Sequence, residues 1–217
     1  MTALPPDPVA TATSAEDALM RGDLSGALSA FATRHLLDFR EPLLIKSDYA
    51  TNGFGVTLWL MGDARGASFV WSRSCGEAYK GRYTHSGSGT FQSGLLLWFA
   101  SVWLKDQGLR GDADRLFDKL LRKKTPVMGA QFPSQLARLV RGETDLAHVA
   151  REYSDAPLLR ERQEMQAVFY AGVRECDAGH RQQAERLWQR IGIPKNPRIE
   201  FEYHLLVYER GRFGASG

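Results

Sequence analysis

The sequence predicts an all-α fold, an array of antiparallel helical hairpins followed by a single C-terminal helix. Three observations support this prediction. A triplet of glycine, alanine and an aromatic residue recurs along the chain, its copies are spaced as in proteins built from stacked units, and apolar residues near the copies recur every three or four positions. With 217 residues, 43% of them hydrophobic and 24% charged, the chain can bury a core of ordinary size.

Each copy of the triplet begins with a glycine that is followed five residues later by an alanine. The glycines are Gly22, Gly62, Gly108, Gly142 and Gly179, and the alanines are Ala27, Ala67, Ala113, Ala147 and Ala184. Nine residues after the glycine, four copies have a large aromatic residue (Phe31, Trp71, Phe117 and Trp188), whereas the fourth copy has Arg151. Successive glycines lie 34 to 46 residues apart, the range in which each unit must stack on its neighbours to bury its apolar face.

The three residue types suit a pair of helices joined by a turn. Glycine adopts the positive φ that ends one helix and lets the next reverse direction. Alanine permits close approach of neighbouring helices, and the aromatic ring fills the volume beyond it. The segment after Gly108 has the matching helical period, with one apolar face made of Leu109, Ala113, Leu116, Phe117, Leu120 and Leu121.

This pattern predicts the following elements in order along the chain. The helical hairpins are expected over residues 14–36, 48–80, 91–124, 133–152 and 157–191, and a last single helix over 198–210 would cap the end of the array. Cap chemistry predicts helix starts at Ser14 with Asp17, at Asp48 and at Ser134, and Pro194 and Pro197 precede the last helix. Residues 14–211 would form the folded domain between two flexible tails, 1–13 and 212–217.

The combined pattern resembles the tetratricopeptide repeat family over about the whole predicted domain. Two copies add a family-like glycine seven residues before the turn, Gly55 and Gly172, where the first and second helices of a pair would pack. The other copies have Ala15, Ser101 and Gln135 in that place. The resemblance implies an α-solenoid whose first helices line a concave surface that holds a peptide or protein segment, with no catalysis and no cofactor.

The residues that stand ten, six and three positions before each turn glycine lie on one stripe of the first helix. The resemblance implies that this stripe contacts the partner, and the loop before the third hairpin is a further candidate contact. The residues expected there are Asn52, Trp59, Tyr83, His85, Trp98, Lys105, Phe132 and Phe169. A groove of this composition would hold an apolar or helical segment, because aromatic rings bury large areas with few rotors. The alternative, that these aromatic residues are core and the groove is filled, stays open.

The stretch YTHSGSGTFQ, residues 83–92, is rich in glycine and serine. It lacks the lysine and the preceding strand of a phosphate-binding loop, and no G-x-S-x-G string occurs in the chain. We therefore predict a connection between the second and third hairpins, with Ser88 or Thr90 as a helix cap. The alternative is a recognition loop that presents Arg82, Tyr83, His85 and Gln92 to a partner.

No metal site, cofactor site or membrane span is predicted. The five histidines stand far apart, Cys75 and Cys176 do not form a C-x-x-C pair, and the longest apolar run, residues 95–104, is too short to cross a bilayer. The N-terminus has no secretory pattern, which together with the few cysteines predicts a cytoplasmic protein.

The functional prediction is a non-catalytic protein-protein interaction module, with an adaptor, a chaperone-like or an effector-inhibiting role left open. Two alternatives belong to other classes. An enzyme would use His85 as a base near a hydroxyl group. A nucleic-acid-binding protein would use exposed basic residues such as Arg122, Lys123, Arg160 and Arg162, although a net charge of +3 gives this reading little support.

Overall fold

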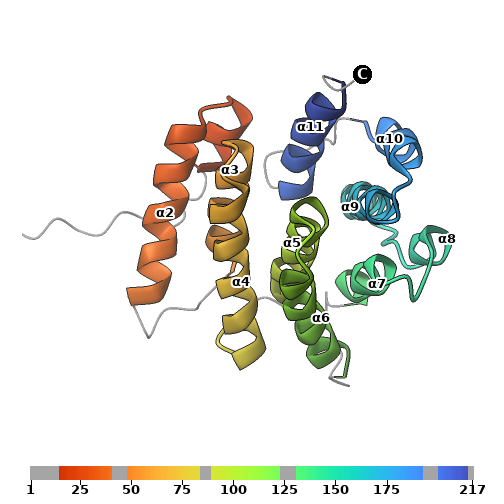
Figure 1. Ribbon diagram of the computed structural model, residues 1–217, viewed down its shortest axis with the longest axis horizontal. Helices are drawn as coiled ribbons and strands as arrows, with labels where there is room; N and C mark the ends of the chain where they lie inside the picture. Colours follow the sequence, from red (N-terminus) through yellow and green to blue (C-terminus); the bar gives the residue numbers. More distant parts are fainter. Residues whose placement is uncertain (1–14, 41–47, 84–88, 123–130, 193–199, 215–217) are drawn as a thin grey trace, which may run out of the picture.

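The computed structural model describes residues 15–40, 48–83, 89–122, 131–192 and 200–214 (Figure 1). Within these ranges the regular structure is helical and there is no strand, which confirms the all-α prediction. A short helical segment spans residues 15–20. The helices that follow are α2 (Leu24–Arg40), α3 (Tyr49–Leu60), α4 (Ala64–Lys80), α5 (Gly89–Leu104), α6 (Gln107–Arg122), α7 (Gln131–Val140), α8 (Leu146–Ala150), α9 (Pro157–Asp177), α10 (Arg181–Gln189) and α11 (Phe201–Gly214).

Helices that follow one another in the chain pack side by side, as Figure 1 shows for α2 to α6. The most extensive contacts join α5 with α6, α3 with α4, α2 with α3, α4 with α5 and α9 with α10. The pairs α3/α4, α5/α6, α7/α8 and α9/α10 match the second to fifth predicted hairpins. The local helical period of the sequence is therefore a reliable guide to these elements.

Four of the five predicted turn glycines have the expected backbone. Gly22, Gly62, Gly142 and Gly179 have φ values between +72° and +87°. This left-handed conformation suits glycine because it has no Cβ to collide with the following carbonyl oxygen. Each of these glycines ends a first helix and allows the chain to turn back.

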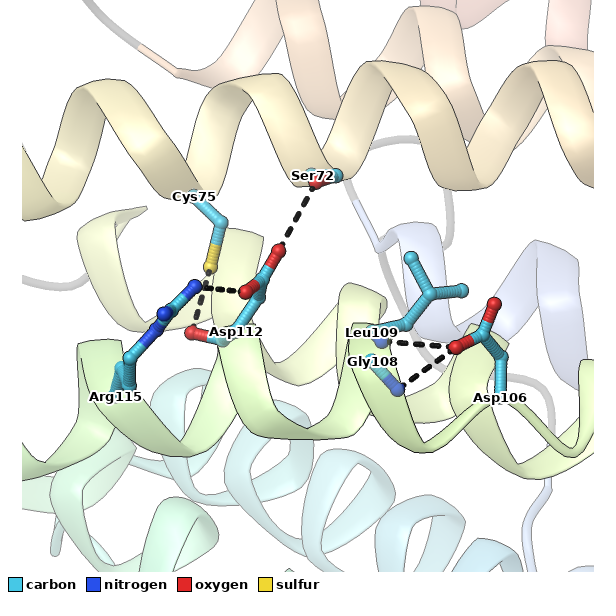
Figure 2. A network of polar contacts seen from close by, with 7 residues as sticks. All are labelled: Ser72, Cys75, Asp106, Gly108, Leu109, Asp112 and Arg115. Carbon is cyan, nitrogen blue, oxygen red and sulfur yellow. Dashed lines mark hydrogen bonds and ion pairs between the residues drawn. The ribbon is translucent and has the colours of Figure 1, made fainter.

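The prediction for Gly108 is wrong, because this residue lies in the first turn of α6. The left-handed turn residue is Lys105, with φ +53°. Helix α6 begins early because Asp106 Oδ1 accepts hydrogen bonds from the backbone N–H groups of Gly108 (2.8 Å) and Leu109 (3.2 Å), as Figure 2 shows. A lysine in this conformation costs about 1 kcal/mol more than a glycine would.

The fourth copy also departs from the predicted triplet. Ala147 is exposed, and the buried residue on α8 is Val149. The reason is that α8 begins after Asp145, whose Oδ1 caps the His148 N–H at 2.7 Å and thereby shifts the inward position by two residues. Tyr153 then takes the role of the missing aromatic, with its ring 5.9 Å from that of Phe132.

Aspartate side chains cap the second helices of the pairs. Asp23, Asp63, Asp106 and Asp145 each accept a backbone N–H at the start of such a helix. The predicted starts at Asp48 and Ser134 differ from this pattern. Asp48 precedes α3 but makes no side-chain cap bond, and Ser134 lies inside α7, which begins at Gln131.

The recurring aromatic residues pack directly on helical glycines. Phe31 lies against Gly53, Trp71 against Gly55, Phe117 against Gly94 and Trp188 against Gly172, and a Cβ on any of these glycines would overlap the ring. The predicted role of Gly55 and Gly172 at helix–helix contacts is thus confirmed. Two of the rings also donate to the backbone of the helix they touch, since Trp71 Nε1 bonds to Asn52 O and Trp188 Nε1 to Phe169 O.

Helix α11 does not cap only the last hairpin, which corrects the prediction for this element. It contacts α3 and α9 as well as α10, and Figure 1 shows it between α3 on one side and α9 and α10 on the other. Its apolar residues Phe201, Leu205 and Leu206 are completely buried. The helix therefore completes the core of the molecule along α3 and α9, so these two helices do not expose a free surface there.

Candidate partner-binding face

Most residues predicted to contact a partner are not at the surface. Asn52, Trp59, Trp98, Phe132 and Phe169 are all buried. Lys105 is exposed and Tyr83 is half-buried, whereas His85 lies outside the described residues. The alternative that the aromatic stripe is core therefore describes these residues better than an open groove does.

We call the sides of α3, α5 and α9 that face α11 the inner face. Helix α11 runs along it in the same direction as α3. At the start of both helices the rings of Tyr49 and Phe201 lie 4.8 Å apart. Near their ends, Trp59 Nε1 donates to Glu209 Oε1 at 2.9 Å. These two contacts determine the register of α11 on the inner face.

Glu209 anchors the C-terminal half of α11 through two tryptophans from different helices. Besides Trp59, Trp103 Nε1 donates to Glu209 Oε2 at 2.7 Å, and Arg212 NH1 lies 3.3 Å from both carboxylate oxygens. The Glu209 side chain is fully buried. Burial raises the pKa of the Glu209 carboxyl, and the hydrogen bonds from Trp59 and the nearby charge of Arg212 oppose this shift.

Glu202 anchors the other end of α11. Tyr170 OH donates to Glu202 Oε1 at 3.0 Å, and the amide groups of Gln92 and Gln166 lie 3.4 Å from Oε1 and Oε2, respectively. Burial raises the pKa of the Tyr170 hydroxyl well above its usual value, and the adjacent Glu202 carboxylate adds to the shift. The donors come from α5 and α9, so the inner face is lined with groups that bind carboxylates on a helix.

Sequence reasoning missed these glutamates, although a signal was present. Glu202 and Glu209 are seven residues apart and share a helical stripe with Leu205 and Leu206. Acidic residues at apolar-face positions of a helix indicate buried carboxylates with specific donors. The stretch was interpreted only as a terminal helix because no nearby residue in the sequence supplies those donors.

Glu200, just before α11, is nearly fully buried and forms an ion pair with Arg162 of α9. Gln166 Nε2 lies 3.5 Å from Glu200 Oε2. Burial raises the pKa of the Glu200 carboxyl to about 7, Arg162 opposes the shift, and the neighbouring Glu202 charge adds to it. The carboxyl therefore changes charge near neutral pH.

This shift predicts a pH dependence of stability. In the unfolded chain Glu200 loses its proton near its ordinary pKa of 4.5, whereas in the folded chain it keeps the proton up to a pH of about 7. The stability contribution of this residue is therefore greatest at the acidic end and decreases as the pH rises through 7, by up to about 3 kcal/mol. Chemical unfolding of Glu200→Gln should show a correspondingly flatter pH profile than the wild type. Glu164→Gln, at an exposed position of α9, should leave the profile unchanged, and parallel curves for Glu200→Gln and wild type would contradict the assignment.

Asn52 and Tyr83 belong to a separate buried polar cluster between α3, α4 and α5. Asn52 Nδ2 donates to Asp48 Oδ2 at 3.3 Å, and the Ser93 hydroxyl lies 2.9 Å from the same oxygen. Ser74 Oγ lies 2.8 Å from Ser93 Oγ and 3.2 Å from Tyr83 OH. The serines, Asn52 and Asp48 are buried, so this cluster joins helices in the interior of the protein.

The predicted connecting loop is shorter than its sequence suggested. Helix α5 begins at Gly89, so residues 89–92 are helical, and Gln92 points to Glu202 of α11. His85 and Ser88 lie outside the described residues. The serine hydroxyls of the neighbouring helices, Ser74 and Ser93, are engaged in the buried cluster.

The two cysteines differ in their surroundings. Cys75 is buried, and its Sγ lies 4.0 Å from the backbone oxygen of Asp112 of α6 (Figure 2). Asp112 also lies close to Ser72 and Arg115, so this network joins α4 to α6. Burial raises the pKa of both thiols, that of Cys176 to about 12, so both are protonated at neutral pH. Cys176 is only half-buried.

A pocket of about 450 Å³ opens where the inner face ends. We call it the Lys105 pocket, and it is lined by Val102, Trp103, Lys105, Cys176, Gly179, Arg181, Glu209 and Arg212. Val102, Lys105 and Cys176 are positions of the predicted inner stripe of α5 and α9. The Lys105 pocket is therefore the place where the predicted stripe reaches the surface beside α11.

Two of the basic residues of the nucleic-acid alternative have acidic partners within the chain. Arg122 forms an ion pair with Asp118 on α6, and Arg162 forms one with Glu200. Arg160 is exposed near the start of α9, and Lys123 lies outside the described residues. Two of the four residues are thus engaged in ion pairs within the described part of the chain.

No family model, curated protein or solved structure matches this chain. In the part of the chain that the structure describes, no group of three or more metal-binding side chains is present. Nor does any described helix combine the length and the apolar character that crossing a bilayer requires.

Proposed function

We propose that the protein binds a segment of another protein without catalysing a reaction, and that the contact centres on the exposed end of the inner face. One observation carries this proposal. The inner face holds a helix, α11, through indole, hydroxyl and amide donors from α3, α5 and α9 that bind its carboxylates. A surface built to hold a helical segment by directed bonds suits recognition of a protein segment.

The same proposal includes a tetratricopeptide-like arrangement of the helical pairs. Three features support it: pairs that follow in chain order, four left-handed glycines at the turns, and aromatic rings seated on helical glycines. In such an arrangement the first helices of the pairs line the concave side. Helix α11 would then occupy part of the concave surface, and the Lys105 pocket would be its accessible remainder.

A cytoplasmic location belongs to the proposal as well. Both cysteines are free thiols, which suits a reducing compartment. An adaptor, a chaperone-like protein and an inhibitor of an effector would all use a binding face of this kind.

The proposal is tested by capturing partners from an extract of the source organism with purified protein. Alanine variants of Trp98 or Phe169 would test folding instead, because both side chains are buried. The informative variant is Lys105→Gln/Arg181→Gln, which alters the Lys105 pocket at two exposed side chains. We expect it to lose a partner that the wild type retains.

The matched control is Arg65→Gln/Lys80→Gln, which removes the same charge from exposed positions of α4. It should retain the partner. Equal retention by the pocket variant and the control would place the contact elsewhere. Turnover of a substrate by the purified protein would contradict the non-catalytic part of the proposal.

A further inference from the structure

Lys105 occupies a backbone position that four other turns give to glycine. Its φ of +53° lies in the left-handed region, as do the φ values of Gly22, Gly62, Gly142 and Gly179. A glycine at 105 would remove the strain at no cost in buried contacts, because the lysine side chain is exposed. Backbone strain at an exposed residue points to a use for its side chain.

The Lys105 side chain lines a pocket that contains two further cations. Arg181 comes from the start of α10 and Arg212 from the end of α11, so three different parts of the fold converge on one space of about 450 Å³. Val102 and Trp103 supply an apolar wall beside them. The pocket therefore combines positive charge with apolar surface.

The acidic group of the pocket is already engaged. Glu209 accepts from Trp59 and Trp103 and pairs with Arg212, which accounts for the charge of both partners. The Cys176 thiol adds no negative charge, since burial raises its pKa to about 12. Arg181 also forms an ion pair, with Glu185 at the surface of α10 (3.7 Å), whereas no described residue forms an ion pair with Lys105. The lining of the pocket thus holds three cations and one carboxylate, and Lys105 is the cation that forms no ion pair with a described residue.

We propose that the Lys105 pocket binds side-chain carboxylates of an acidic segment of the partner protein. This inference rests on the proposed function and specifies the chemistry of the partner. Lys105 and Arg181 pair with the carboxylates, and the methylene groups of an aspartate or glutamate side chain contact Val102 and Trp103. The strained lysine is explained because a glycine at this turn would leave the pocket without its exposed ammonium group.

The test uses a fluorescein-labelled peptide of six glutamates, with a six-glutamine peptide as its reference, and measures fluorescence polarisation. We expect the wild type to bind the glutamate peptide at least tenfold more tightly than the glutamine peptide, and the affinity to fall as salt is raised. Lys105→Gly should weaken binding of the glutamate peptide about tenfold. The same variant should unfold at a temperature about 2–4 °C higher, because it relieves the strained turn.

Lys105→Arg should keep most of the affinity, and Arg65→Gln on α4 should keep all of it. The inference is overturned if the glutamate peptide does not bind, or if Lys105→Gly binds it as well as the wild type does. It is also overturned if inorganic phosphate at millimolar concentration occupies the pocket in preference to the peptide. A native partner that still depends on Lys105 and Arg181 in the capture experiment would then leave the proposed function standing while this inference fails.

Discussion

The substitution Gly172→Ala in α9 is expected to lower the free energy of unfolding by about 3 kcal/mol. On helix propensity alone the substitution would stabilise α9 by up to about 1 kcal/mol, since alanine is the better helix former. The tertiary contact reverses the sign. A Cβ at Gly172 would overlap the indole ring of Trp188, which is itself buried and bonded through Nε1 to Phe169 O. The ring cannot move aside without losing that bond and its contact with Phe169.

Urea or thermal unfolding of the purified variant measures this effect. The matched control is Gly76→Ala in α4, where a Cβ would meet nothing within 4 Å. It should stabilise the protein by about 0.5–1 kcal/mol. Combining Gly172→Ala with Trp188→Leu should cost less than the sum of the two single changes, because the smaller side chain removes the collision. A neutral or stabilising Gly172→Ala would show that α9 and α10 do not pack as described.

Glu209→Ala is expected to cost about 2–4 kcal/mol of stability. The change leaves the indole N–H groups of Trp59 and Trp103 without the carboxylate that accepts their hydrogen bonds. It also opens a cavity at a fully buried position between α11, α3 and α5. A polar group that loses its partner inside a protein incurs its full desolvation cost, so one substitution affects two donors at once.

Unfolding monitored by tryptophan fluorescence reports this change directly, because two of the affected groups are indoles. Glu209→Gln keeps one acceptor oxygen, so its loss of stability should be about half that of Glu209→Ala. Glu164→Ala, at an exposed position of the neighbouring α9, should stay within about 0.5 kcal/mol of the wild type. A loss at Glu209 no larger than at Glu164 would mean that α11 is not anchored by this carboxylate.

The position of α11 changes how the predicted binding stripe is interpreted. Trp59 and Phe169 were expected to face a partner, yet they serve the core beneath the chain's own last helix. An aromatic residue at helical spacing has the same sequence signature in both roles. The choice between them depended on whether another element covers the stripe, and that element lies up to 150 residues away in the chain.

The exposed part of the candidate site was only partly visible in the sequence. Lys105 was selected by its offset from Gly108, although the turn lies at Lys105 itself. Arg181 and Arg212 were not selected, because they join Lys105 only when α10 and α11 pack against α5. The three cations come together only through the packing of three helices, and no short stretch of the sequence indicates this.

The sequence by itself determined the helices, most of their turns and the place of Gly55 and Gly172 at helix–helix contacts. These features depend on backbone preferences and on a period of about four residues, which act between neighbours in the chain. Only the tertiary structure decided that α11 lies on the inner face, that Glu202 and Glu209 are buried there, and that three cations meet at its end. Such contacts are set by which apolar surfaces remain to be covered once the helical pairs have formed, and that depends on the whole chain.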